Sequence, residues 1–331
     1  MVKIVVLPGD GIGPEVIEAA VKVLRSLIPS LTFEYFEIGL ELFKRTGETI
    51  TEESVEELKK VGVGLLGPVS SPLNLASNYK SPVLTLRREL DLYANVRPIR
   101  NFPGVPSFFT NVDLVVIREN LEGLYSMIEA PYDDGYAAYK VITKRGSFRI
   151  AKFAFEYARR EGRRKITVIH KANVLRKTFG LFREIFYTVA KDYPDIDCDE
   201  KIVDTAAMLM ATNPTAFDVV LTTNLFGDII SSIGAGVTCG LGLAPSANIG
   251  DRCALFTPLH GSAPDIAGKN IANPGAAILS ATMLLNHLGF KNEAKRVENA
   301  LIKTIIEGVK TRDIGGSAST TEFTSAVIER L

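Results

Sequence analysis

The chain has 331 residues, and its 38 Lys and Arg balance 38 Asp and Glu to a formal net charge of +0 at pH 7. This balance argues against a nucleic-acid partner, which would require a basic surface. No apolar run approaches the roughly 20 residues of a membrane span, which argues against a membrane partner. Hydrophobic residues make up 46%, so we expect one large domain or two joined domains.

Composition also bears on the compartment. Cys198, Cys239 and Cys253 are scattered without metal-binding spacing, and the first residues lack the shape of a signal peptide. Both features favour reduced, structural thiols in the cytoplasm. The absence of Gln, together with many Glu, Lys and Arg, suggests a thermophilic source.

In chain order, short apolar runs alternate with helical patterns. Residues 3–10 are predicted to form a buried strand, and 14–28 an amphipathic helix. A charged helix over 51–60 precedes a strand, and the further predicted strands lie at 61–68, 112–120, 165–173, 217–224 and 253–261. This alternation predicts an α/β sheet whose ligand lies beyond the carboxyl ends of the strands.

The glycine-rich stretch LPGDGIGPEV at 7–16 follows the first strand. Its spacing is G-x-G-x-G, one residue shorter than the dinucleotide fingerprint G-x-G-x-x-G, and Pro14 opens the helix. The stretch is therefore either a phosphate-binding loop or a tight turn between strand and helix. A Rossmann dehydrogenase is disfavoured.

Several cationic and proton-transfer groups lie near the ends of predicted elements. Arg87, Arg97 and Arg118 together could hold a polyanion, because a guanidinium can bind a carboxylate through two hydrogen bonds. Tyr125 and Lys171 could form a proton-transfer pair, since a nearby cation lowers the pKa of a phenol. Taken singly, residues of these types more often have a structural or surface role.

Two acidic residues and a histidine complete the candidates. Asp204 and Asp228 could bind Mg²⁺ or Mn²⁺, which prefer carboxylate oxygens, and helix capping is the alternative for both. His260 begins a stretch with Gly261 and Ser262 that could wrap an adenosine.

Ordered motifs then carry a resemblance that runs nearly from end to end. They are LPGDGIGPEV at 7–16, DLYANVRP at 91–98, RENLEGLY at 118–125, HKANVLR at 170–176, TTNLFGDIIS at 222–231, GLGLAPSANIGD at 240–251 and HGSAPDIAGKNIANP at 260–274. With these motifs the chain resembles the β-decarboxylating dehydrogenases, which act on isocitrate, homoisocitrate, 3-isopropylmalate or tartrate. It looks closest to homoisocitrate and archaeal isopropylmalate members.

The resemblance implies an isocitrate/isopropylmalate dehydrogenase-like fold, with two α/β subdomains sharing a large twisted mixed sheet. We expect a large, cofactor-binding subdomain at 1–98 plus 252–331, and a small one for dimerisation, metal and substrate at 99–251. The segment 129–143 would be an inter-subunit arm, which is compatible with a plain hairpin. A homodimer with shared active sites is implied, or a tetramer of such dimers.

The reaction implied is oxidation of a (2R,3S)-2-hydroxy acid with a 3-carboxylate, followed by loss of CO₂, with Mg²⁺ or Mn²⁺ at the developing enolate. Carried over by position, the carboxylate-binding residues are Arg87, Arg97 and Arg118. Tyr125 would protonate the enol carbon and Lys171 would help to remove the hydroxyl proton. The metal would be held by Asp204 and Asp228, and in this family the Lys and one Asp come from a second subunit.

NAD is the expected cofactor. Asp265 would accept hydrogen bonds from both hydroxyls of the adenosine ribose and repel the 2′-phosphate of NADP. Family members that use NADP have Lys and Tyr where this chain has Asp265 and Ile266. The residues assigned to NAD by the resemblance are Ile12, Asn173, His260, Gly261, Ser262, Ala263, Pro264, Asp265, Ile266 and Asn273.

Three positions depart from the family pattern. Ser232 stands where a further metal-binding acid is usual, Thr257 replaces a Glu, and Leu121 replaces a Thr. Fewer acids predict weaker metal binding. These departures also leave open an alternative function, that of a non-catalytic regulatory subunit of such an enzyme.

The stretch before Arg87 bears on the choice of substrate. Isocitrate enzymes usually have Ser and then Asn two residues on, whereas here Ser81 is followed by Val83. The apolar pair Val83 and Leu84 favours homoisocitrate first, 3-isopropylmalate second and isocitrate third.

Overall fold

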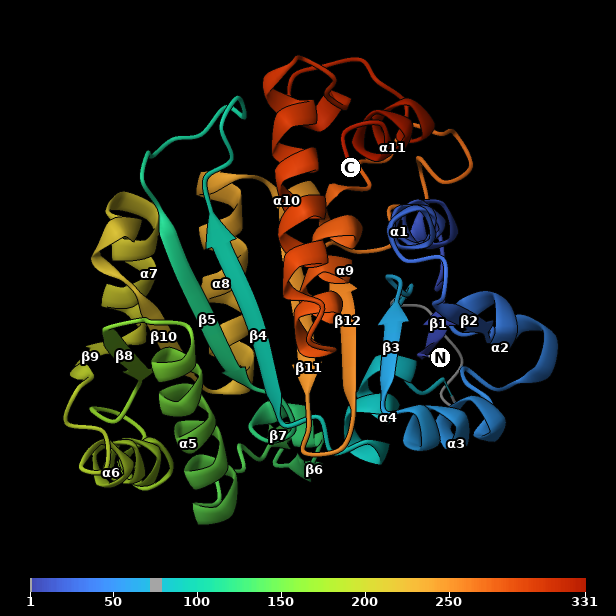
Figure 1. Cartoon of the computed structure of the whole chain (residues 1–331). Helices are drawn as coiled ribbons and strands as arrows, with labels where there is room; N and C mark the ends of the chain where they lie inside the picture. The colour runs from blue at the N-terminus through green and yellow to red at the C-terminus, as the bar shows by residue number, and fades with distance from the viewer. Residues whose placement is uncertain (1, 72–78) are drawn as a thin grey trace. The chain divides into compact units, whose positions relative to one another are not determined.

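The computed structural model describes residues 2–71 and 79–331. It divides into unit 1, which comprises Met1–Leu92, Asn101–Ser107 and Cys239–Leu331, and unit 2, which comprises Tyr93–Arg100 and Phe108–Thr238. Each unit contains mixed β-sheet with helices, and this confirms the expected α/β class (Figure 1). In the described residues, no helix is both long and apolar enough to cross a membrane.

The strands of unit 1 follow the order β2-β1-β3-β12-β11. Neighbours are parallel except β11, which runs antiparallel to β12. The strands are β1 (Lys3–Leu7), β2 (Thr32–Tyr35), β3 (Val63–Leu66), β11 (Pro245–Ile249) and β12 (Ala254–Pro258). The predicted strands at 3–10, 61–68 and 253–261 thus form, each shortened by its turn residues.

Helices pack on both faces of this sheet because successive side chains of a strand point to opposite sides. Ile4 and Val6 of β1 belong to one buried cluster, and Val5 and Leu7 belong to another. The larger cluster includes residues of α1 (Gly13–Leu27), α9 (Gly275–His287), α10 (Lys291–Ile306) and α11 (Thr320–Ile328). The smaller one includes residues of α3 (Glu52–Val61) and α4 (Pro82–Glu89), and α2 (Leu40–Thr46) lies between β2 and α3 in the chain.

The glycine stretch after β1 is a close-packed turn. The N–H of Asp10 donates to the carbonyl of Pro68, and the N–H of Ile12 to the carbonyl of Ser262, both at 2.8 Å. A Cβ on Gly11 would lie only 2.0 Å from the same Ser262 oxygen, so glycine permits this approach. Because these N–H groups are bonded within the protein, the structure favours the tight turn over the phosphate loop.

The strands of unit 2 follow the order β4-β5-β10-β8-β9. Only β4 is antiparallel to its neighbour among these described strands. The strands are β4 (Ala94–Arg100), β5 (Asp113–Glu119), β8 (Lys165–His170), β9 (Asp197–Ile202) and β10 (Val219–Thr222). The parallel strands end at one edge, which brings the residues after them to the same side.

Alternation along β5 also sorts the two faces of unit 2. Leu114 and Val116 lie in a buried cluster with α7 (Val203–Thr212) and α8 (Asn224–Thr238). Val115 and Ile117 point to the opposite face, where α5 (Lys144–Arg160) packs on the sheet and on α6 (Thr178–Ala190). The hairpin β6 (Glu129–Tyr132) and β7 (Gly135–Ala138) lies within the segment where an arm was predicted.

The limits of the units fall at other residues than the expected 98 and 251. Residues 93–100 belong to unit 2, because β4 pairs along its whole length with β5. Residues 239–251 belong to unit 1, because β11 pairs with β12. Strand pairing between segments distant in sequence sets these limits, and it leaves no local signal at either boundary.

Gly227 of α8 lets that helix approach β5 closely, as α8 lies alongside β4 and β5 in Figure 1. A Cβ at position 227 would lie 2.7 Å from both Cβ and Cγ of Arg118. These atoms are the stiff base of the side chain, so they cannot move away without shifting the strand or the helix.

We therefore expect Gly227→Ala to lower the free energy of unfolding by roughly 1–3 kcal/mol through overpacking. Gly180→Ala is the matched control, because its Cβ would meet nothing within 4 Å. The control should gain about 0.5–1 kcal/mol from helix propensity. Urea unfolding of both variants measures the difference, and equal values would contradict this account of the packing.

Candidate active site

Two arginines come together because of strand register. Arg97 of β4 and Arg118 of β5 are on antiparallel neighbours, and Arg118 stands directly opposite Asn95. Odd-numbered residues of β4 and even-numbered residues of β5 therefore share the face that α8 covers. Both arginine side chains are buried there.

Asp228 of α8 is the shared partner of this arginine pair. Its Oδ1 accepts hydrogen bonds from Nη1 of Arg97 at 2.9 Å and from Nη1 of Arg118 at 2.6 Å. Its Oδ2 accepts one from the Tyr125 hydroxyl at 2.9 Å. The Tyr125 ring, on the short 3₁₀ turn η1 (Leu124–Ser126), also lies 5.1 Å from the Arg118 guanidinium.

Further polar groups hold the guanidinium planes in place. Asn95 Oδ1 accepts from Nε of Arg97 at 2.6 Å. Asn224 Oδ1 accepts from both Nε and Nη2 of Arg118, at 3.0 and 2.6 Å. Sequence reasoning missed these asparagines and Ser231, whose hydroxyl accepts from Arg97 at 2.7 Å. All three lie within the quoted motifs. Asn95 and Arg97 are two residues apart on one strand and so share a face, which could have indicated the role of Asn95.

Burial and charge act against each other at this cluster. Burial and the neighbouring Arg118 lower the pKa of Arg97 to about 10, so it stays charged at neutral pH. For Asp228, burial opposes ionisation, but Arg118 and Arg97 still hold its pKa below the usual value. Asp228 remains 37% exposed, whereas Arg118 is 1% exposed. The surplus positive charge is therefore buried, while the carboxylate that contacts it is partly exposed.

Lys171 and Asp204 form a second group in unit 2. Lys171 follows β8 and Asp204 opens α7, and the Lys171 ammonium donates a short hydrogen bond to Asp204. The preceding His170 is buried, and its Nδ1 accepts from the N–H of Ala172 at 3.1 Å, so this nitrogen carries no proton. Burial also lowers the pKa of His170, so the ring is neutral at pH 7. The hydrogen bond from Ala172 to this ring supports the turn that carries Lys171.

Within one chain the structure does not join these groups. No hydrogen bond or ion pair in the described part of the chain connects Lys171 or Asp204 with Tyr125 or Asp228. Among residues 2–71 and 79–331, no three acidic, His or Cys side chains gather in a way that could hold a metal. Ser232, the position of the missing acid, donates its hydroxyl to the Asp228 carbonyl at 2.8 Å.

The expected substrate-specificity residues lie in unit 1. Ser81 precedes α4, and its carbonyl accepts from the N–H of Thr85 at 3.0 Å. Val83 packs against the smaller buried cluster of unit 1, while Leu84 is half-buried on the same helix. Arg87 is buried in the last turn of α4.

The expected NAD residues of unit 1 follow β12. Ala263 has a φ of +36°, a strained value for a residue with a Cβ and typical of functional loops. His260 Nδ1 lies 3.0 Å from the Gly261 carbonyl, to which a protonated Nδ1 donates. Its Nε2 is buried and has no hydrogen-bond partner among the residues that the structure describes. Burial lowers the pKa of His260, so Nε2 is an acceptor that suits a ribose hydroxyl or an adenine amine.

The remaining NAD candidates are surface or anchoring residues. Pro264 and Asp265 are exposed and Ile266 is half-buried. Asn273 donates to Asp313 at 2.9 Å and accepts from the N–H of Gly275. Asn173 is exposed in unit 2, close behind Lys171 in the chain, and Thr257 is half-buried with its hydroxyl 3.4 Å from the Pro258 carbonyl.

Glu119 is a buried carboxylate at the end of β5 that sequence reasoning also missed. Its oxygens accept from the N–H groups of Leu121 and Glu122, both at 2.9 Å, and so shape the turn that leads to Tyr125. Burial raises its pKa to about 7, although these two N–H groups oppose the change. Between pH 4.5 and 7 the folded protein therefore binds more protons at Glu119 than the unfolded chain.

This sign predicts that Glu119 makes the protein less stable as the pH rises through that window. We expect the free energy of unfolding of Glu119→Gln, relative to the natural chain, to rise by roughly 2–3 kcal/mol between pH 5 and pH 8. Urea midpoints at both pH values provide the measurement, with the exposed Glu161→Gln as control. A pH-independent difference would show that Glu119 ionises normally.

Comparison with known proteins identifies the family of the chain. The isocitrate/isopropylmalate dehydrogenase family matches residues 3–327. The chain is 47% identical to a 3-isopropylmalate dehydrogenase of Archaeoglobus fulgidus over 100% of both chains. It is 49% identical to an isocitrate/homoisocitrate dehydrogenase of Thermus thermophilus, covering 99% of this chain and 98% of the relative.

A solved structure supports the same assignment. The isocitrate dehydrogenase from Methylococcus capsulatus matches with a TM-score of 0.96 and 42% identity, over 100% of this chain and 99% of that one. This confirms the fold class that the sequence motifs predicted. The chain therefore belongs to the isocitrate/isopropylmalate dehydrogenase family, whose members are metal-dependent, NAD(P)-linked enzymes that oxidise and decarboxylate their substrates.

Proposed function

We propose that this protein catalyses the NAD-dependent oxidative decarboxylation of a (2R,3S)-2-hydroxy-3-carboxy acid, with homoisocitrate, converted to 2-oxoadipate, as the first choice. The main support for this proposal is that the buried Arg97 and Arg118 and the Tyr125 hydroxyl all donate hydrogen bonds to the Asp228 carboxylate. Two guanidinium groups against one carboxylate leave a surplus of positive charge, which suits a polycarboxylate. The name of the Thermus relative, which includes homoisocitrate, supports this choice.

The residues of the chain have distinct parts in this reaction. Arg97 and Arg118 would bind substrate carboxylates and hold the hydroxy acid in one orientation. Lys171 of the partner subunit would help to remove the proton of the C2 hydroxyl as hydride leaves C2 for NAD. After CO₂ is lost, Tyr125 would deliver its hydroxyl proton to the enol carbon.

A divalent metal fits the donor chemistry only if two chains contribute. Asp228 offers a partly exposed carboxylate, the ligand type that Mg²⁺ and Mn²⁺ prefer. Asp204 is the second carboxylate assigned to the metal, and we propose that it comes from the partner subunit. When bound, the metal supplies electrostatic stabilisation of the enolate oxygen. Ser232 adds no charge, so we expect weaker metal binding than with a third acid.

A homodimer follows from the same separation of groups. Lys171 and Asp204 bond to each other and not to the arginine cluster, so one chain holds an incomplete set. Large apolar side chains are exposed on unit 2, including Met208 and Ile229 of α7 and α8 and Tyr132 and Tyr136 of the β6–β7 hairpin. Such a surface marks a protein interface, and we propose that the hairpin is the arm between subunits. Two dimers could pair into a tetramer.

Other candidates differ in substrate or in class. The relative from Archaeoglobus fulgidus is named 3-isopropylmalate dehydrogenase, and the half-buried Val83 and Leu84 suit an isopropyl group as well. Isocitrate stands third. A non-catalytic regulatory subunit is the alternative of another class, and the presence of Tyr125, Lys171 and the arginines weighs against it.

We expect kcat/KM with NAD and Mn²⁺ to fall in the order homoisocitrate, 3-isopropylmalate, isocitrate. Homoisocitrate and isocitrate should differ only modestly, because they are one methylene apart, and one methylene changes the activation free energy by only about 1–3 kcal/mol. NAD should be preferred over NADP because Asp265 repels a 2′-phosphate. Parallel assays of the three acids with both cofactors decide this. An isocitrate preference would refute the role of Val83, and no turnover by folded dimers would favour the regulatory subunit.

Shared active sites predict complementation between two inactive variants. Tyr125→Phe and Lys171→Met should each lose roughly 10²–10⁴-fold in kcat when assayed alone. Refolded together, they should recover about a quarter of the natural activity, because half of random dimers are mixed and each mixed dimer keeps one intact site. If the mixture stays as inactive as its parts although mixed dimers form, Tyr125 and Lys171 act within one chain.

A further inference from the structure

The segment 262–270 of unit 1, which carries Asp265, lacks regular secondary structure over the described residues. Its backbone φ is positive at Ala263 (+36°), Gly268 (+72°) and Asn270 (+56°). Two of these three residues carry a Cβ, so the conformation is unfavourable unless the surroundings impose it. Contacts from other parts of unit 1 must therefore hold the segment in place.

The first turn of α1 holds both ends of this segment. At one end, the N–H of Ile12 donates to the Ser262 carbonyl at 2.8 Å. One turn later along α1, the Glu15 carboxylate accepts from the N–H of Gly268 through a short hydrogen bond and from the N–H of Asn270 at 3.2 Å. One side chain, that of Glu15, thus accepts hydrogen bonds from the backbone N–H groups of two residues with positive φ, Gly268 and Asn270.

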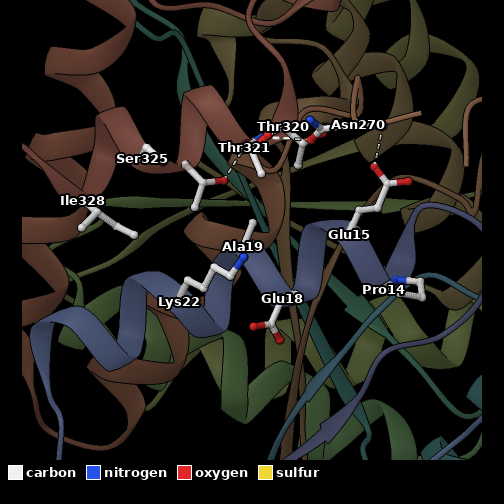
Figure 2. Close-up of a pocket in the computed structure, with 11 residues that line it drawn as sticks. Pro14, Glu15, Glu18, Ala19, Lys22, Asn270, Thr320, Thr321, Ser325 and Ile328 are labelled. Atoms are coloured by element: carbon white, nitrogen blue, oxygen red, sulfur yellow. Dashed lines mark hydrogen bonds between the residues drawn. The ribbon is translucent and has the colours of Figure 1, made fainter. Parts of the chain in front are cut away.

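The same end is tied to the start of α11. The Asn270 side chain donates to the Thr321 hydroxyl at 2.6 Å and accepts from its N–H at 3.1 Å, and the Asn270 carbonyl accepts from the N–H of Thr320 at 3.0 Å. Figure 2 shows Glu15, Asn270, Thr320 and Thr321 around a pocket of about 390 Å³. Asn270 is therefore fixed between α1 and α11.

Between its two fixed ends the segment bonds to itself. The N–H of Ile266 donates to the Ala263 carbonyl at 3.1 Å, and the Lys269 ammonium donates to the Asp265 carbonyl at 2.7 Å. The Asp265 side chain is exposed at the middle of this span. Its position therefore follows from where the two ends are held.

We propose that Glu15 is a positioning residue for NAD, whose carboxylate holds the segment 262–270 so that Asp265 meets the adenosine ribose. This inference rests on the proposed function, which assigns Asp265 to that ribose. A carboxylate is required because both of its oxygens accept hydrogen bonds. A glutamine would present an NH₂ group to one of the two backbone N–H groups and leave that N–H without an acceptor.

The test compares Glu15→Gln with Glu18→Gln. Glu18 is one turn further along α1 and lines the same pocket, but it bonds to the Tyr35 hydroxyl. The readouts are the Kd of NADH by fluorescence, the Ki of ADP-ribose as a competitive inhibitor, kcat at saturating NAD, and KM for the hydroxy acid. ADP-ribose carries the adenosine half without the nicotinamide, so it reports on the segment directly.

For Glu15→Gln we expect the Kd of NADH and the Ki of ADP-ribose to rise together by about tenfold. The kcat at saturating NAD and the KM for the hydroxy acid should stay within about twofold, because the Glu15 carboxylate bonds to the segment 262–270 and not to the residues assigned to the hydroxy acid. Glu18→Gln should match the natural chain in all four. Thr321→Val removes the hydroxyl that accepts from the Asn270 side chain. It should also raise the Kd of NADH and the Ki of ADP-ribose, by less than Glu15→Gln does, and leave kcat and the KM for the hydroxy acid unchanged. This second variant keeps the test valid if Glu15→Gln folds poorly.

An unchanged Kd in both Glu15→Gln and Thr321→Val would overturn the proposal. So would a parallel loss in KM for the hydroxy acid and in kcat, because that pattern indicates general loosening of the protein. Failure of the natural chain to bind NADH is a different result, which refutes the proposed function and this inference with it.

Discussion

Unit 2 depends on the pairing of the Asp228 carboxylate with two buried arginines, Arg97 and Arg118. Burying two guanidinium groups side by side costs several kcal/mol per ion in lost hydration, about the size of a whole domain's stability. Asp228 offsets this cost by accepting from both, and Asn95 and Asn224 satisfy further N–H groups. One carboxylate cannot neutralise two cations, so the cluster keeps a net positive charge in its interior. The lowered pKa of Arg97 reflects the same cost of burying a cation beside a second cation.

Strand geometry explains why these groups meet. Arg97 and Arg118 are distant in sequence, but the β4–β5 register places them on one face, and Gly227 lets α8 bring Asp228 down onto that face. A shift of one residue in this pairing would place Arg97 and Arg118 on opposite faces of the sheet. The polar cluster and the apolar packing of Leu114 and Val116 therefore depend on one register, and the stability of the sheet and the geometry of the site are coupled.

Much of this could be predicted from the sequence, because periodicity and turn residues are local signals. The apolar runs ending in polar residues predicted β1, β3, β5, β8, β10 and β12 but not β2, β4, β9 or β11, and the motifs around Arg118, Tyr125 and Asp228 indicated the candidate site. The pairing of β4 with β5 was not accessible in this way, since it depends on a partner distant in the chain. Ser231 was missed for the same reason, because it bonds to Arg97 on a strand distant in the chain. Asn95 bonds to Arg97 within the same strand, so strand parity could have indicated it. The raised pKa of Glu119 was hidden too, because burial is a property of the packed unit.

The arrangement of Asp228 also bears on the missing acid at Ser232. In this structure both Asp228 oxygens are bonded, Oδ1 to the arginines and Oδ2 to Tyr125. In the proposed reaction, substrate carboxylates would replace Asp228 as partners of the two guanidinium groups, and the freed Asp228 carboxylate would be available to hold a divalent metal. The arginines would then always have an anionic partner, so the cost of burying them is met before and after the substrate arrives. Under the proposed function, a polyanionic substrate would bring its own negative charge to the site, which would offset the acid that is missing at Ser232.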